Sequence, residues 1–166
     1  MKTLMPLLSL FLIVHHLQAR LGETEAQIEI RYGKPYKVDP VGFSANDCGK
    51  WYSHDDVTII VHYYNGVSHY EAYRKNDGEP FTPKEIELLL SVNKPAEYVW
   101  NPFPKEYANP QFLKQWYLSN VQKTKIIENA LYYPNNSLVF ETRVFSDYLS
   151  KSPGKGDKGI NKSSGF

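Results

Sequence analysis

Two histidines in a predicted β-hairpin have the spacing best suited to binding a metal ion. Strand-like sequence lies on both sides of Asn65-Gly66, a pair that tolerates the positive φ angles of a tight two-residue turn. In the register that such a turn sets, His62 lies directly opposite His69, with Glu71 nearby as an oxygen ligand. A zinc site takes three or four ligands, so the alternative is a pair of half-exposed sheet residues in cross-strand contact.

The single cysteine is the one thiol nucleophile in the chain. Asn46-Asp47-Cys48-Gly49 resembles the Asp-Cys start of papain-like cell-wall peptidases, in which a histidine well downstream activates the thiol. Here His54, His62 and His69 all lie within 21 residues of Cys48, and no histidine follows them. The chain also contains no glycine-rich phosphate loop, serine nucleophile elbow or His-Glu-x-x-His helix. We therefore predict no catalytic residue and favour a buried, unreactive thiol in a fold without disulfides.

An aromatic, proline-rich segment at residues 100–112 is the predicted binding element. Three prolines restrict its backbone, which predicts a long, fixed loop rather than a helix or strand. Trp100, Phe103 and Tyr107 are the candidate binding residues, because aromatic side chains bury a large area and Trp and Tyr keep a polar tip. Aromatic residues are also typical of strands, so a purely structural role is the alternative.

The predicted hairpin also indicates which strand face is buried. Pairing Tyr64 with Val67 fixes the register of the two strands. The expected core face then carries Val57, Ile59, Val61 and Tyr63 opposite Arg74, Ala72, Tyr70 and Ser68. A second hairpin is expected around the Pro134-Asn135-Asn136 turn, with its return strand running over residues 137–145.

Two helix starts carry the same capping chemistry. Thr24 with Gln27, and Thr82 with Glu85, each form a capping box that satisfies orphan backbone donors at the start of a helix. The two starts are 58 residues apart and each precedes strand-like sequence. This predicts two tandem helix-then-strands units, at residues 20–80 and 81–149. The alternative is that capping boxes recur by chance in unrelated helices.

The order of short motifs in the first half resembles a known family. Gly22-x-Thr24, Ile28, Gly33-x-Pro35, Trp51 and Val61-x-Tyr63-x-Asn65-Gly66-Val67 are similar to the small protein A / outer-membrane lipoprotein A family, mainly over residues 21–75. The resemblance implies the fold of the β-lactamase-inhibitor protein. That fold is of the α+β class, with helices packed on one face of an antiparallel sheet. It also implies a role in the bacterial envelope, as an assembly-factor lipoprotein or a protein that binds other proteins.

The two ends of the chain differ from the middle. Residues 1–19 form a predicted secretory signal peptide, with a basic start at Lys2, a short apolar core and cleavage near Ala19. The core is too short to span a bilayer, and no cysteine follows it as a lipid attachment site. We expect an exported domain at residues 20–149, periplasmic or extracellular, with no membrane span or lipid anchor. The Ser-, Gly- and Lys-rich residues 150–166 predict a disordered tail.

The charge balance limits the classes of partner. Without Lys2, the chain has 18 basic and 18 acidic residues, which argues against nucleic acid as a partner. We expect a non-enzymatic binding or envelope-associated protein, with another envelope or secreted protein as its partner and no cofactor. The alternatives are a secreted hydrolase or metal-dependent enzyme with a dispersed site, and a secreted protein inhibitor.

Overall fold

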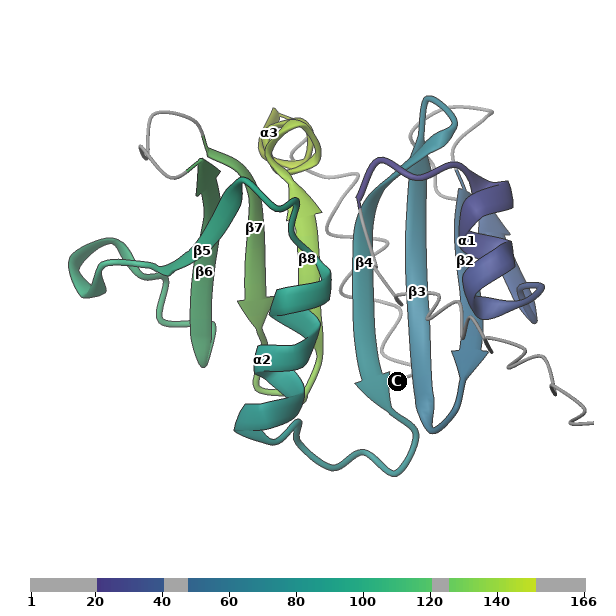
Figure 1. Cartoon of the computed structure of the whole chain (residues 1–166), viewed down its shortest axis with the longest axis horizontal. Helices are drawn as coiled ribbons and strands as arrows, with labels where there is room; N and C mark the ends of the chain where they lie inside the picture. Colours follow the sequence, from purple (N-terminus) through teal and green to yellow (C-terminus); the bar gives the residue numbers. More distant parts are fainter. Residues whose placement is uncertain (1–20, 41–47, 121–125, 152–166) are drawn as a thin grey trace, which may run out of the picture.

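A single antiparallel sheet organises the chain (Figure 1). The computed structural model describes residues 21–40, 48–120 and 126–151. The predicted signal peptide at residues 1–19 and the tail after residue 151 lie outside these ranges. Across the eight-stranded sheet, the order is β1 (Lys37–Pro40), β2 (Cys48–His54), β3 (Val57–Tyr64), β4 (Val67–Lys75), β8 (Leu138–Thr142), β7 (Ile126–Tyr132), β6 (Lys114–Asn120) and β5 (Tyr98–Pro102).

The order of a helix followed by four strands occurs in both halves. Helix α1 (Glu25–Tyr32) precedes β1 to β4, and helix α2 (Pro83–Val92) precedes β5 to β8. The halves meet at the centre of the sheet, where β4 pairs with β8. The exact unit boundaries at residues 20–80 and 81–149 remain a prediction. The chain ends its described part in helix α3 (Arg143–Lys151), which includes the first two residues of the predicted tail.

The expected fold class is wrong. The structure is mostly sheet with a few short helices, and the helices do not all lie on one face. Helices α1 and α2 lie on the same face, where Ile28 and Ile86 are buried in one cluster (Figure 1). Helix α3 packs on the opposite face, where Phe145 contacts the rings of His62 and Tyr70.

Helix α3 replaces the end of a predicted strand. We expected residues 137–145 to be extended, but β8 stops at Thr142 and the helix begins at Arg143. The hydroxyl of Thr142 accepts a hydrogen bond from the backbone N–H of Phe145 at 3.2 Å, which is N-cap chemistry. A threonine therefore ends the strand and starts the helix within one residue.

Both predicted capping boxes are present. The N–H of Thr82 donates to Glu85 Oε2 at 2.6 Å, and the N–H of Glu85 donates to Thr82 Oγ1 at 3.3 Å. At the first helix, the N–H of Thr24 donates to Gln27 Oε1 at 2.9 Å. Local sequence thus determines where α1 and α2 begin.

The predicted hairpin turn is confirmed, but its register is wrong after two pairs. Asn65 and Gly66 have φ angles of 52° and 80°, as a two-residue turn requires. Tyr64 pairs with Val67 as expected, yet a β-bulge next to His62 shifts all later pairs. The core face of β4 therefore carries Glu71 and Tyr73, and not the expected Tyr70 and Ala72.

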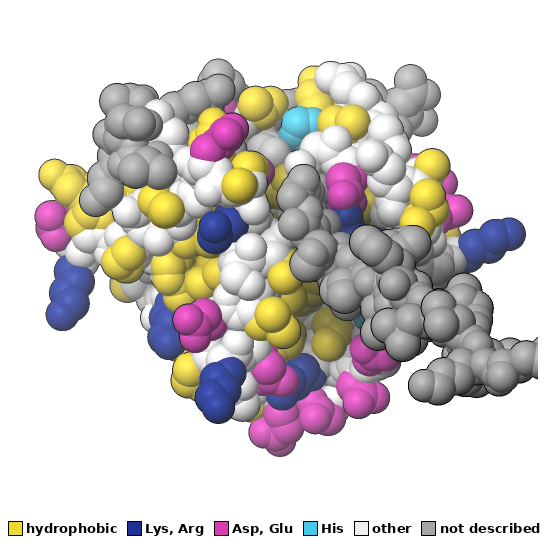
Figure 2. Space-filling view, in the orientation of Figure 1, with side chains coloured by type: hydrophobic (Ala, Val, Ile, Leu, Met, Phe, Trp, Pro, Cys, Tyr) yellow, Lys and Arg dark blue, Asp and Glu magenta, His cyan; other side chains and the backbone are white. Residues whose placement is uncertain are grey.

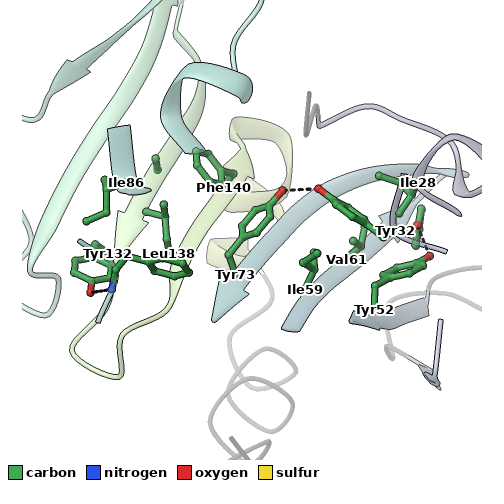
Figure 3. Packing of buried hydrophobic residues seen from close by; sticks show 13 residues of the cluster. Ile28, Tyr32, Tyr52, Ile59, Val61, Tyr73, Ile86, Tyr132, Leu138 and Phe140 are labelled. Atoms are coloured by element: carbon green, nitrogen blue, oxygen red, sulfur yellow. Dashed lines mark hydrogen bonds between the residues drawn. The ribbon is translucent and has the colours of Figure 1, made fainter. Parts of the chain in front are cut away.

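The larger hydrophobic cluster lies between the sheet and helices α1 and α2 (Figure 3). Its fully buried members include Ile28, Tyr52, Val61, Leu138 and Phe140. A smaller cluster on the opposite face contains Ile60, Ala72, Leu131 and Val139, with Trp51, Tyr70, Phe112 and Tyr133 packed against it.

Candidate binding site at the β5–β6 loop

Trp100, the first predicted binding residue, has a structural role. It lies within β5, so the predicted loop starts later than residue 100. Its indole N–H donates to the backbone oxygen of Leu90 at 2.7 Å, and its ring centroid lies 5.7 Å from that of Phe140. Trp100 therefore ties the end of α2 to the sheet.

Phe103 and Tyr107 lie in the loop of residues 103–113, which connects β5 to β6 and projects from the edge of the sheet (Figure 1). Phe103 packs edge-on against Tyr117, with ring centroids 5.6 Å apart. Tyr107 is the last residue of the short 3₁₀ helix η1 (Lys105–Tyr107) and its side chain is 75% exposed. Exposed hydrophobic side chains lie on this side of the molecule, beside basic and acidic ones (Figure 2).

A pocket lies at the base of this loop. Its volume is about 260 Å³, and its walls come from the two ends of the loop and the start of β6. Phe112, one of the lining residues, packs edge-on against Tyr133 with ring centroids 4.7 Å apart. Leu113, another lining residue, is 59% exposed. The full lining set is Pro102, Phe103, Ala108, Phe112, Leu113, Lys114, Gln115 and Trp116.

Backbone and amide hydrogen bonds hold the loop in one shape. The backbone oxygen of Asn109 accepts from Gln115 Nε2 at 2.7 Å and from the N–H of Phe112 at 3.2 Å. The side-chain oxygen of Asn109 accepts from the N–H of Gln111 at 3.1 Å. These bonds and the loop prolines restrict the conformations of the loop, which lowers the entropic cost of binding.

Lys114 supplies the one formal charge among the lining residues. Lys114 is exposed, so its ammonium group is accessible to a binding partner. The remaining polar contribution comes from Gln115, whose amide nitrogen is already used within the loop. The site thus combines aromatic and aliphatic walls with a positive rim, which suits an apolar group next to an anionic one.

The predicted metal pair is not assembled. Because of the bulge, His62 lies opposite Tyr70, and their rings stack with centroids 4.7 Å apart. His69 Nδ1 instead hydrogen-bonds Thr142 Oγ1 at 2.8 Å. Burial lowers the pKa of His62 to about 4. No group of three or more metal-ligating side chains occurs within the described ranges.

Cys48 lies at the start of β2, opposite Tyr63, and packs against the larger hydrophobic cluster. Its surroundings are those of a half-buried core residue. Sequence reasoning found the loop but not Phe112, Leu113, Lys114 and Trp116 as lining residues. Their contribution depends on where β6 begins, which no local motif indicates.

Comparisons with known proteins give only a weak structural likeness. No protein-family model and no curated protein sequence matches the chain. One similar solved structure is a cysteine-rich secretory protein from Staphylococcus aureus, at 11% identity and a TM-score of 0.42. The match covers 78% of this chain and 46% of that protein. A likeness of this degree carries no functional argument, and the resemblance to the small protein A family remains a prediction.

Among the described helices, none is long and apolar enough to cross a membrane.

Proposed function

We propose that the protein is a non-enzymatic binding protein that holds a segment of another protein at the β5–β6 loop. The observation that carries this proposal is the pocket at the base of the loop, with exposed Leu113 in its wall and exposed Tyr107 in the same loop. Exposed apolar side chains around a concave site are typical of interaction surfaces.

The pocket size and charge define the partner segment. A volume of about 260 Å³ is below the range of roughly 300–1,000 Å³ that drug-sized ligands occupy, and it suits a single large side chain. Lys114 favours a carboxylate next to that side chain. The partner segment therefore presents an aromatic or branched apolar residue adjacent to an acidic one.

Side-chain insertion is the favoured mode of recognition, because the neighbouring sheet edge is poorly suited to strand addition. Strand β5 is the outermost strand on this side. The N–H of Tyr98 is already bonded to the oxygen of Pro95 at 3.1 Å, and Pro102 has no N–H to offer. An added strand would find few free donors along this edge.

The predicted signal peptide at residues 1–19 supports a partner in the envelope or among secreted proteins. If that partner is a secreted hydrolase and its activity falls on binding, the protein acts as an inhibitor. The loop is then the inhibitory element.

Capture with matched variants tests the proposal. The purified protein is immobilised and exposed to envelope and secreted fractions, and bound proteins are quantified by mass spectrometry. We expect Tyr107→Ala and Leu113→Asp to reduce capture of a specific partner at least about tenfold, because hot-spot side chains dominate interfaces.

Leu88→Asp is the control for this experiment. Leu88 is 62% exposed but lies on α2, so its replacement makes the same chemical change away from the loop. Equal capture by the wild type and both loop variants would contradict the proposal. A loss of capture with Leu88→Asp alone would move the interface to α2.

A further inference from the structure

A buried carboxylate is linked to helix α1 through two tyrosines. Figure 3 shows the contact between the two tyrosine hydroxyls. Glu71 on β4 has no exposed surface, and its Oε2 accepts a hydrogen bond from the Tyr73 hydroxyl at 2.6 Å. The Tyr73 hydroxyl lies 3.0 Å from the hydroxyl of Tyr32, the last residue of α1. A continuous polar chain therefore runs from the sheet to the helix through the hydrophobic cluster.

The segment before α1 is fixed to the same strand. The backbone N–H groups of Gly22 and Glu23 donate to Ser68 Oγ at 3.1 and 3.2 Å. The N–H of Ser68 donates in turn to the oxygen of Glu23 at 2.8 Å. The Glu23 carboxylate also pairs with Arg31 of α1. The segment and the helix together are attached to β4, the strand that carries Glu71.

The groups around Glu71 act in opposite directions: burial and the charge of Glu23 oppose its ionised form, whereas the hydrogen bonds of Tyr73 and Ser68 and the charge of Arg31 favour it. Arg31 on α1 is the cation that faces it, but Glu23 already pairs with that guanidinium. Glu23 places negative charge nearby, and Glu128 on β7 is a second carboxyl whose pKa is raised, in part by the charge of Glu71. The other titratable neighbours are Tyr32 on α1, Tyr63 on β3 and Tyr73 on β4.

The second carboxyl oxygen of Glu71 increases the cost of ionising this side chain. Oε1 is buried and has no hydrogen-bond partner within the described part of the chain. Burial raises the pKa of Glu71 to about 7, against the hydrogen bonds from Tyr73 and Ser68 that favour the ionised form. Burial raises the pKa of Glu128 to about 8, and the charge of Glu71 adds to that effect.

We propose that Glu71 is a proton-controlled latch for helix α1. With the carboxyl protonated, the Tyr73–Tyr32 chain holds α1 against the sheet. When the proton leaves, the carboxylate needs water or a free cation, and α1 with its tyrosine closes off both. Ionisation therefore loosens the packing of α1 and opens the sheet face beneath it.

Helix α2 provides an internal reference, because the buried anchors described for it contain no carboxyl group. Trp100 donates to the oxygen of Leu90 at the end of α2, and Ile86 is buried in the cluster. The Tyr132 hydroxyl accepts a hydrogen bond from the N–H of Phe81, just before α2, at 3.1 Å (Figure 3). The same molecule therefore contains one helix with an acid in its anchor and one without.

The sign of the effect follows from the raised pKa. A carboxyl whose folded pKa lies above the ordinary value of 4.5 binds its proton more tightly in the closed state. The latch is strongest below pH 4.5 and weakens as the pH rises through about 7.

Amide hydrogen exchange of the full chain between pH 5 and 8.5 tests the latch. After correction for intrinsic rates, protection of residues 25–32 should fall about 10- to 100-fold with rising pH. Protection of residues 83–92 should change less than about threefold. In Glu71→Gln, which keeps the shape but cannot ionise, α1 protection should no longer depend on pH.

Glu141→Gln is the matched control. Glu141 is also buried and its pKa is also raised by burial, but it lies on the opposite face of the sheet. This variant should keep the wild-type pH dependence of α1. A carboxyl-carbon NMR titration of Glu71 in the wild type gives a second measurement that needs no variant, and its midpoint should match that of α1 protection.

Three outcomes would overturn the latch: α1 protection that does not change with pH in the wild type, a Glu71 midpoint that does not coincide with the change in α1, or undiminished pH dependence in Glu71→Gln. None of these measurements involves the β5–β6 loop.

Discussion

Each face of the sheet buries a carboxyl whose pKa is raised, Glu71 under α1 and α2 and Glu141 under α3, but the α3 face also encloses a histidine. The face under α1 and α2 buries Glu71, whose pKa is raised by burial. The face under α3 encloses His62, whose pKa is lowered by burial. Both groups are held in their neutral forms. Glu71 becomes charged as the pH rises, and His62 becomes charged as the pH falls. The two contributions change in opposite directions between pH 4.5 and 6.5, so folding stability should have a shallow maximum in that range.

The largest expected difference between the faces is in packing. Phe140 and Val139 are neighbours on β8 that point to opposite faces, and both are buried. Phe140 contacts the rings of Tyr73 and Trp100, each with centroids 5.7 Å apart, and so bridges the two halves. Phe140→Ala should cost about 3–5 kcal/mol in urea unfolding, and Val139→Ala about 2 kcal/mol. Equal costs would mean that the two clusters contribute equally.

The next largest effect is alkaline destabilisation from the helical face. Because the folded pKa of Glu71 is about 7 and its ordinary value is 4.5, its contribution is complete below pH 4.5 and lost as the pH rises through 7. The loss should reach about 3 kcal/mol in the free energy of unfolding. Glu71→Gln should remove the part of this limb that Glu71 contributes, and the raised pKa of Glu128 should leave a smaller slope up to about pH 8. A profile that stays steep in the variant would assign the effect to Glu128.

A slightly smaller effect is expected at acid pH from the α3 face. The pKa of His62 is lowered from 6.5 to about 4, so the His62 contribution to stability is complete above pH 6.5 and is lost as the pH falls towards 4. We expect a loss of about 2 kcal/mol, reduced because the side chain is only half-buried. His62→Phe keeps a ring against Tyr70 and removes the titration. It should flatten the acid limb and leave the alkaline limb unchanged.

The smallest effect concerns the anchor of α2, on the same face as Glu71. Trp100→Phe removes the hydrogen bond to the Leu90 oxygen but keeps an aromatic ring, so we expect a loss of about 1 kcal/mol at every pH. Thermal unfolding at pH 5.5 and pH 8 checks this. Partner capture by the β5–β6 loop should be unaffected. Reduced capture would show that Trp100 contributes to binding.

Features set by a few neighbouring residues could be predicted from the sequence. The capping boxes at Thr24 and Thr82 and the turn at Asn65-Gly66 each satisfy a local backbone requirement, and each is present. The aromatic segment was also found, although its first residue, Trp100, belongs to a strand.

Features set by long-range pairing could not be predicted. The bulge beside His62 inserts one residue into β4, and this alone separates His62 from His69 and turns Glu71 inward. A one-residue shift sends every later side chain to the other face. The pairing of β4 with β8 and the position of α3 depend in the same way on contacts between distant parts of the chain.

The central pairing of β4 with β8 has a consequence for how the molecule can be divided. Each half is continuous in sequence, and the sheet crosses between them through the four pairs of Tyr70–Tyr73 with Leu138–Glu141. The covalent link is the short connection between Lys75 and Pro83, where the Gly78 oxygen accepts a hydrogen bond from Asn136 Nδ2 at 3.0 Å. A single protease cut at this connection leaves two fragments that the central strands and Phe140 still hold together. Reassembly of the two fragments would then measure the strength of the pairing between β4 and β8.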